Sequence, residues 1–259
     1  MTAALMVREL GDGPPVLLLH AFPCDGRMWL PQAEELADAG FGVIVPDLPG
    51  FGGSPLLDGP PSLAAVADIL IEWLDGHGIE RCVLGGVSLG GYVSMALLRV
   101  RPDLATRLLL CDTKATADAE PAREKRERLA QLCLAAPAET GRILEQAVLP
   151  GLLGDTTRAS RPQVVSVVRG WLDEATAEAV AWYQRAMAAR PDSMELLAGL
   201  EVPALVLFGD EDALSPASEQ ELMLAAMSQS RRVEVKGAGH LANVEIPTRV
   251  ASEILGFLA

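Results

Sequence analysis

The sequence predicts an α/β protein with a mostly parallel central sheet, flanking helices and a helical segment inserted near the middle of the chain. Three observations lead to this prediction. Short apolar runs alternate with helix-like stretches in the first and last parts of the chain. Most of these runs are apolar almost throughout, as strands buried on both faces should be. Between residues 113 and 200 the alternation stops.

The runs that we interpret as strands are bounded by Gly, Pro or Asp and rich in Val, Leu and Ile. In chain order they are residues 16–20, 42–47, 82–87, 107–112, 204–209 and 231–235. Helices are expected between and after them, at residues 32–39, 62–76, 89–99, 215–228 and 247–258. Residues 62–76 show the pattern best, because their apolar residues recur at helical spacing and form one stripe.

Residues 113–200 contain no convincing buried strand and favour helix instead. The expected helices are residues 120–134, 137–148, 161–171 and 173–190, separated by Pro and Gly. We therefore expect a core domain made of residues 1–112 and 201–259, with residues 113–200 inserted over one edge of its sheet.

Composition and charge exclude several classes of function. The chain has 259 residues, of which 50% are hydrophobic, so a disordered protein is excluded. The formal net charge of −14 would repel phosphate backbones and anionic lipid, so we expect neither nucleic acid nor a membrane as a partner. No apolar run approaches the roughly 20 residues that a bilayer requires. Since the first residues show no export signal, we expect a cytoplasmic protein.

The four cysteines give no sign of a metal site or a disulfide framework. Cys24, Cys82, Cys111 and Cys133 are scattered and form no C-x-x-C pair. In a large cytosolic chain such residues are most simply buried free thiols. Neither a phosphate loop nor a dinucleotide fingerprint is present either, so no metal and no cofactor are expected.

One short motif carries the chemistry. The residues Gly86-Val87-Ser88-Leu89-Gly90 lie between an expected strand and an expected helix. This is the G-x-S-x-G pattern of a nucleophile elbow, in which a tight turn projects a serine hydroxyl into open space. The following helix directs its free N–H groups and the positive end of its dipole at the same point. Ser88 is therefore the candidate nucleophile.

A serine nucleophile needs a base, and the chain has only three histidines. His240 follows the last expected strand, in a Gly-rich loop that can bring an imidazole to the carboxyl edge of the sheet. His20 ends the first expected strand and is more plausible as a brace for the following turn. His77 lies at the Gly-flanked end of a helix, where a solvated side chain is expected.

The base in turn needs an acid that orients it and stabilises the imidazolium. Asp212 is the choice, because it follows the strand 204–209 in a short loop and precedes His240 by 28 residues. Asp112, at the end of the strand after the elbow, is the serious rival, since an acid there could also reach the base.

An acyl-transfer site also needs N–H donors around the developing oxyanion. Two backbone groups are candidates, those of Leu89, directly after the nucleophile, and of Phe22, in the turn that follows the first strand.

With Ser88, Asp212 and His240 in this order, the sequence resembles the α/β-hydrolase family over nearly its whole length. Besides the elbow, the resemblance is carried by the turns at residues 20–23, 47–54, 209–212 and 239–240. It implies that fold, the roles given above, and a helical cap formed by residues 113–200. The family often has Gly at the position of Ala21, and Ala fits there if its φ is not positive.

Within the family, the chain looks most like small bacterial esterases and lactonases of the enol-lactonase and cofactor-free haloperoxidase type. Ser88 argues against dehalogenases and epoxide hydrolases, which use Asp as the nucleophile. The resemblance implies hydrolysis of a small-molecule ester or lactone through an acyl-enzyme on Ser88. A lyase or acyltransferase using the same residues, and a binding protein with a vestigial triad, remain alternatives. The substrate and the oligomeric state are left open.

Four large cap residues are candidates for an apolar substrate pocket: Trp171, Trp182, Tyr183 and Met187. The competing interpretation is that they fill the core of the cap itself, as aromatic and Met residues at helical spacing usually do.

Overall fold

In the computed structural model, which describes residues 5–259, seven strands form one sheet in the order β1-β3-β2-β4-β5-β6-β7. The strands are β1 (Val7–Leu10), β2 (Pro15–Leu19), β3 (Gly42–Pro46), β4 (Cys82–Val87), β5 (Ala105–Cys111), β6 (Ala204–Gly209) and β7 (Ser230–Val235). Each neighbouring pair is parallel except β1 and β3, which are antiparallel. This confirms the α/β fold with a mostly parallel sheet, and every strand expected from the sequence is present.

The sequence did not predict β1. It spans only four residues, and Arg8 and Glu9 interrupt the apolar pattern on which strand prediction depends. Its place at the edge of the sheet accounts for this composition, because an edge strand is open to water on one side and charged side chains discourage pairing with other chains.

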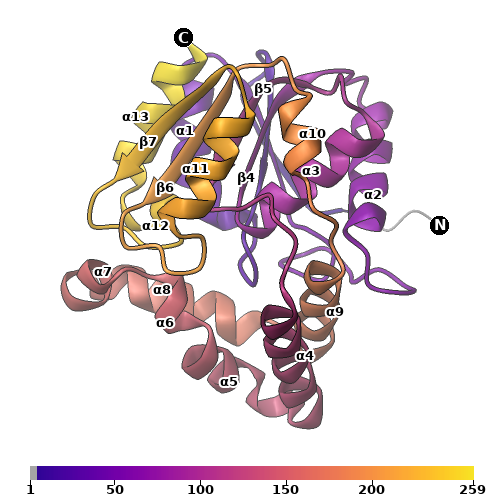
Figure 1. The fold of residues 1–259 in the computed structure, drawn as a ribbon, viewed down its shortest axis with the longest axis vertical. Coiled ribbons are helices and arrows are strands. Elements are labelled where there is room, and N and C mark those ends of the chain that lie inside the picture. The colour runs from indigo at the N-terminus through magenta and orange to yellow at the C-terminus, as the bar shows by residue number, and fades with distance from the viewer. Residues whose placement is uncertain (1–4) are drawn as a thin grey trace.

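Helices flank the sheet (Figure 1). The longer ones are α1 (Leu30–Asp38), α2 (Leu63–Gly76), α3 (Leu89–Val100), α11 (Ala217–Ala226) and α13 (Pro247–Leu258), and the short ones are η1 (Gly26–Trp29), α10 (Met194–Ala198) and α12 (Ala242–Glu245). Helix α2 has the expected apolar stripe, and the hydroxyl of Ser62 caps it by accepting from the N–H of Ala65. Within the described residues, no helix is long and apolar enough to cross a bilayer.

Residues 120–188, between β5 and β6, are helical and form a separate layer, at the bottom of Figure 1. Its helices are α4 (Glu120–Ala135), η2 (Pro137–Glu139), α5 (Thr140–Ala147), α6 (Leu149–Leu152), α7 (Asp155–Ser160), α8 (Pro162–Glu174) and α9 (Ala177–Ala188). This layer contacts the loops that follow the sheet strands. Trp182 donates to the carbonyl of Gly59, and Arg161 donates to that of Gly237. The layer therefore lies against the carboxyl edge of the sheet.

One expected helix boundary in this segment is wrong. The break between the third and fourth helices, placed at residues 171–173, comes later, because α8 continues to Glu174. Ala175 is extended, and the hydroxyl of Thr176 caps α9 by accepting from the N–H of Ala179. The N-terminal cap at Thr176 therefore marks the start of the next helix better than the apolar pattern does.

Candidate active site

Ser88 occupies the turn between β4 and α3 in a strained backbone conformation, with φ 52° and ψ −109°. The flanking glycines are required because backbone packs against them directly. A Cβ on Gly86 would lie 2.1 Å from the carbonyl carbon of Gly90, and a Cβ on Gly90 would lie 2.1 Å from the oxygen of Leu19. The hydroxyl of Thr113 donates to the carbonyl of Ser88 at 2.8 Å and braces the turn.

The loop after β7 brings His240 to this serine. Its Nε2 lies 2.7 Å from the Oγ of Ser88, although 152 residues separate the two in the sequence. The imidazole is almost completely buried, so a proton shared with Ser88 is shielded from bulk water. The sequence prediction that His240 meets Ser88 thus agrees with the geometry.

Asp212 lies on the other side of the imidazole. Its two carboxylate oxygens are 3.0 and 2.9 Å from Nδ1 of His240. The carboxylate is fixed in turn by the backbone N–H groups of Leu214 and Ser215, which donate to Oδ1 at 2.8 and 3.0 Å. Because a carboxylate only accepts, Nδ1 must carry the proton, and Nε2 is then free to accept from the hydroxyl of Ser88.

The rival acid, Asp112, serves a different set of partners. Its carboxylate accepts from the N–H of Gly209 at 2.8 Å and from the N–H of Ala242 at 3.1 Å. Burial, reinforced by the charge of Asp212, raises the pKa of Asp112 well above its ordinary value. Asp112 therefore ties the end of β6 to the segment after His240, while Asp212 contacts the imidazole.

The two expected oxyanion donors lie in backbone positions with free N–H groups. Within residues 5–259, neither the N–H of Phe22 nor that of Leu89 donates to a protein acceptor. Leu89 is the first residue of α3, where intrahelical partners for N–H are missing by geometry. Ala21 does not have a positive φ, so Ala is accommodated where the family often has Gly.

The other two histidines lie where the sequence indicated. His20 is fully buried, and its Nε2 accepts from the N–H of Leu48 at 2.8 Å while Nδ1 faces the carbonyl of Ala21 at 3.0 Å. Burial lowers the pKa of His20, so it braces the turn in its neutral form. His77 is exposed and stacks on Trp73 at the end of α2.

The four expected pocket residues, Trp171, Trp182, Tyr183 and Met187, are all buried within the hydrophobic core. Tyr183 packs against Phe51 with ring centroids 4.9 Å apart, and its hydroxyl finds no hydrogen-bond partner in the part of the chain that the structure describes. A role in binding substrate remains a prediction for all four.

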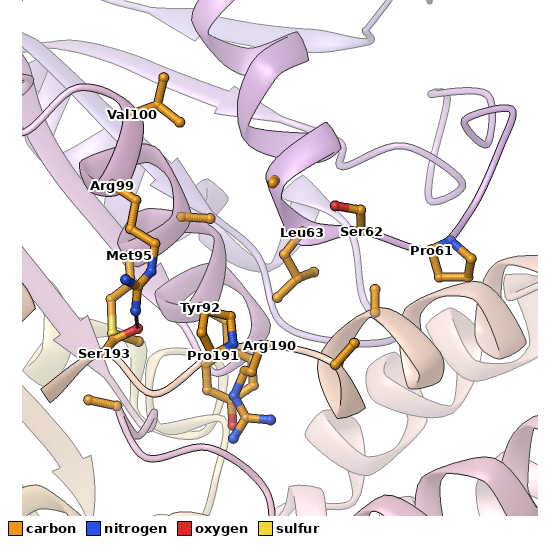
Figure 2. A pocket seen from close by; sticks show the side chains of 15 residues that line it. Pro61, Ser62, Leu63, Tyr92, Met95, Arg99, Val100, Arg190, Pro191 and Ser193 are labelled. Carbon is orange, nitrogen blue, oxygen red and sulfur yellow. Dashed lines mark hydrogen bonds between the residues drawn. The ribbon is translucent and has the colours of Figure 1, made fainter.

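A cavity of about 190 Å³ opens on the outer face of α3, between the start of α2 and the end of α9 (Figure 2). Tyr92, Met95 and Arg99 of α3 lie on one side together with Arg190 and Pro191, and the guanidinium of Arg190 lies 4.1 Å from the ring centroid of Tyr92. Pro61, Ser62 and Leu63 lie on the other side. Ser88, Asp212 and His240 are not among its lining residues, so this cavity is separate from the serine-histidine pair.

The four cysteines are buried free thiols, as expected. Among the described residues, no three His, Cys, Asp or Glu side chains are grouped as a metal ion requires.

Sequence reasoning missed one buried carboxylate of the site. Glu245, in α12, accepts from the backbone N–H groups of Gly239 and Leu241 on either side of His240. An acidic residue in the first turn of a helix that directly follows the histidine is the signal that could have found it, because such a side chain reaches back to the N-terminal N–H groups.

Known proteins share this fold. Residues 16–253 match the alpha/beta hydrolase family. The structure is similar to a thermophilic esterase from Thermogutta terrifontis, with a TM-score of 0.93 and 42% identity over 98% of this chain and 92% of that one. It is also similar to the enol-lactonase from Burkholderia xenovorans LB400, with a TM-score of 0.88 and 26% identity over 98% and 96% of the two chains.

A further relative is similar in sequence. A pimeloyl-(acyl-carrier protein) methyl ester esterase of Aeromonas salmonicida is 26% identical over 98% of this chain and 99% of its own length. Since the family match covers most of the chain, the protein is a member of the alpha/beta hydrolase family.

Proposed function

We propose that the protein is a serine hydrolase that cleaves a carboxylic ester or lactone of a small to medium, partly apolar substrate. The observation that carries this proposal is the 2.7 Å contact between the Oγ of Ser88 and Nε2 of His240, with Asp212 on the opposite ring nitrogen. The similarity to an esterase and an enol-lactonase supports the choice of an acyl carbon as the reacting atom.

In the proposed reaction, the hydroxyl of Ser88 attacks the carbonyl carbon while its proton passes to Nε2 of His240. Asp212 stabilises the resulting imidazolium. The N–H groups of Phe22 and Leu89 bind the oxyanion of the tetrahedral intermediate. Collapse of this intermediate breaks the bond to the leaving oxygen, which takes the proton from His240, and leaves an acyl group on Ser88.

Deacylation repeats the sequence with water. His240 takes a proton from the water molecule, whose oxygen attacks the acyl carbon, and then returns the proton to Ser88 as the acid leaves. With a lactone, the alcohol and the acid are two ends of one molecule, so a single hydroxy acid is released. We assign residues 113–200 the role of a cap that shields this chemistry from bulk water.

The test is a chain-length series of aryl esters and lactones, measured with the wild type and with Ser88→Ala. We expect hydrolysis by the wild type and a loss of at least about 10⁴-fold in kcat for Ser88→Ala, with an unchanged circular dichroism spectrum. Equal turnover by both proteins would refute the assignment of Ser88.

Product analysis separates the proposal from its alternatives. With alcohols, amines or thiols added as acceptors, we expect the free acid to remain the main product. A main product in which the acyl group is joined to the acceptor would identify an acyltransferase. Tight binding of esters without turnover by the wild type would identify a binding protein.

A further inference from the structure

Buried carboxylates hold the loop that carries His240. The two backbone N–H groups that flank this residue, those of Gly239 and Leu241, share one oxygen of Glu245, at 2.8 and 3.3 Å. The side chain of Glu245 reaches back from α12 to the N–H of Leu241, the N-cap residue of this helix, much as the acid of a capping box does. Fixing both neighbouring peptide groups fixes the path of the backbone at His240.

The second oxygen of Glu245 points to a different part of the chain. It accepts from the N–H of Gly154 at 2.9 Å, 91 residues away, at the start of α7. The backbones meet so closely here that a Cβ on Gly239 would lie 2.2 Å from the nitrogen of Gly154. One carboxylate therefore joins the histidine loop to the helical layer that covers the carboxyl edge of the sheet.

The side chain of Glu245 is 3% exposed, which is a costly place for a carboxylate. Burial raises its pKa, whereas hydrogen bonds from Thr157, Gly154 and the histidine loop oppose this shift. A positively charged side chain near Glu245 is that of Arg161, which donates to the hydroxyl of Thr157 and to the carbonyl of Gly237. Further charged groups around the histidine loop are Asp112 and Asp212, Asp210, which accepts from Gly237 and pairs with Lys236, and Glu211, whose carboxylate accepts from Thr156.

We propose that Glu245 is a positioning residue, which holds His240 at the hydroxyl of Ser88 by fixing the two peptide groups beside it against the helical layer. The inference rests on the proposed function for its kinetic consequences, although the geometry itself does not depend on the substrate.

Glu245→Gln tests the proposal with little change in shape. An amide has one acceptor oxygen, so its NH₂ group must face the backbone of either the histidine loop or Gly154, and both present N–H donors to it. We expect kcat to fall about tenfold to 100-fold, because a small displacement of a catalytic base is costly, while KM changes less than threefold. Loss of a negative charge near the imidazolium should also move the acid limb of the kcat/KM profile to lower pH by about half a unit.

Two further variants separate position from charge. Glu245→Asp keeps the charge but is one methylene too short to reach both sets of donors, so kcat should fall while the acid limb stays in place. Glu211→Gln is the matched control, because Glu211 also accepts from the helical layer, at the N–H of Thr156, but does not contact the N–H groups beside His240. Its kcat/KM should stay within threefold of the wild type, with an unmoved acid limb.

A measurement without substrate keeps this inference distinct from the proposed function. In proton NMR, the Nδ1–H of His240 bonded to Asp212 should give a far-downfield signal in the wild type and in Glu211→Gln. In Glu245→Gln and Glu245→Asp it should broaden or disappear. Unchanged signals together with an unchanged kcat in both Glu245 variants would overturn the positioning role. A wild type that shows the signal pattern but turns over no ester would overturn only the proposed function.

Discussion

Ser88 adopts a backbone conformation that costs roughly 1–3 kcal/mol for a residue with a side chain. The surrounding contacts hold it there: Gly86 and Gly90 let the backbone close around the turn, and Thr113 hydrogen-bonds the carbonyl of Ser88. Among residues 5–259, the other residue with a side chain and a positive φ is Asp112, at the end of the neighbouring strand. Both lie at the carboxyl edge of the sheet, close to the contact between Ser88 and His240.

The two aspartates near His240 give a prediction at this scale. Asp212→Asn removes the acceptor that sets the tautomer of His240, so kcat should fall about 10³- to 10⁴-fold. Asp112→Asn keeps that contact and loses one of two backbone hydrogen bonds, so kcat/KM should fall less than tenfold. Steady-state kinetics on both variants tests the assignment. An Asp112→Asn variant as inactive as Asp212→Asn would transfer the role of the acid to Asp112.

Whether a residue of the candidate site can be predicted from the sequence depends on whether a short sequence pattern marks it. Ser88 is predictable from the sequence because G-x-S-x-G is a local constraint on one turn. His240 and Asp212 are predictable because each follows an expected strand, and parallel strands end at the same edge. Glu245 was missed because the apolar pattern does not report an acid that reaches back to the N–H groups before its own short helix, and because its contact with Gly154 spans 91 residues.

At the scale of elements, two connecting segments join the helical layer to the sheet, one after β5 and one before β6. The two segments are hydrogen-bonded to each other. The N–H of Ser193 donates to the carbonyl of Ala115 at 2.8 Å. Asp118 accepts from Arg190 at 2.9 Å and also pairs with Arg126 of α4. Burial alone would raise the pKa of Asp118, but the two guanidinium groups outweigh it and hold that pKa well below its usual range.

This ion network gives a pH-dependent prediction. Asp118→Asn leaves Arg190 buried without its counter-charge, so at pH 7 the free energy of unfolding should fall by about 3–5 kcal/mol. The pKa of Asp118 is lower in the folded state than in the unfolded chain. The stability that its carboxylate contributes is therefore complete above about pH 4 and is lost as the pH falls through the pKa of the folded state. Urea unfolding at pH 7 and pH 3 should show a smaller difference between the two proteins at pH 3. A difference that is the same at both pH values would contradict the account.

Strands were easier to predict than helix ends. Most parallel strands here are continuous apolar runs, and each strand that the sequence predicted is present. The charged edge strand β1 is also present, but the sequence did not predict it. The boundary between α8 and α9 depends on the cap at Thr176, which the apolar pattern does not report. A single hydrogen bond can decide where a helix begins or ends. The apolar period is a property of many residues, so it does not locate these ends.

At the scale of the molecule, the sheet places Ser88, His240 and Asp212 at one edge although they come from distant parts of the chain. β4 lies centrally in the sheet, while β6 and β7 form one end of it and are followed by Asp212 and His240. The order of strands does not follow from any local pattern, because pairing depends on contacts between distant segments. The helical layer meets the loops after β6 and β7, so it covers the edge where the three side chains converge.

The central claim is that the hydroxyl of Ser88 is a nucleophile activated by His240. Peptide mass spectrometry after treatment with a fluorophosphonate tests this claim most directly, because the reagent loses fluoride as its phosphorus bonds to an activated serine oxygen. We expect one phosphonyl group per chain, on the peptide that contains Ser88, with the rate of labelling at least about 10³-fold lower in His240→Ala. Labelling at another residue, or labelling of Ser88 at the same rate without the imidazole, would contradict the account.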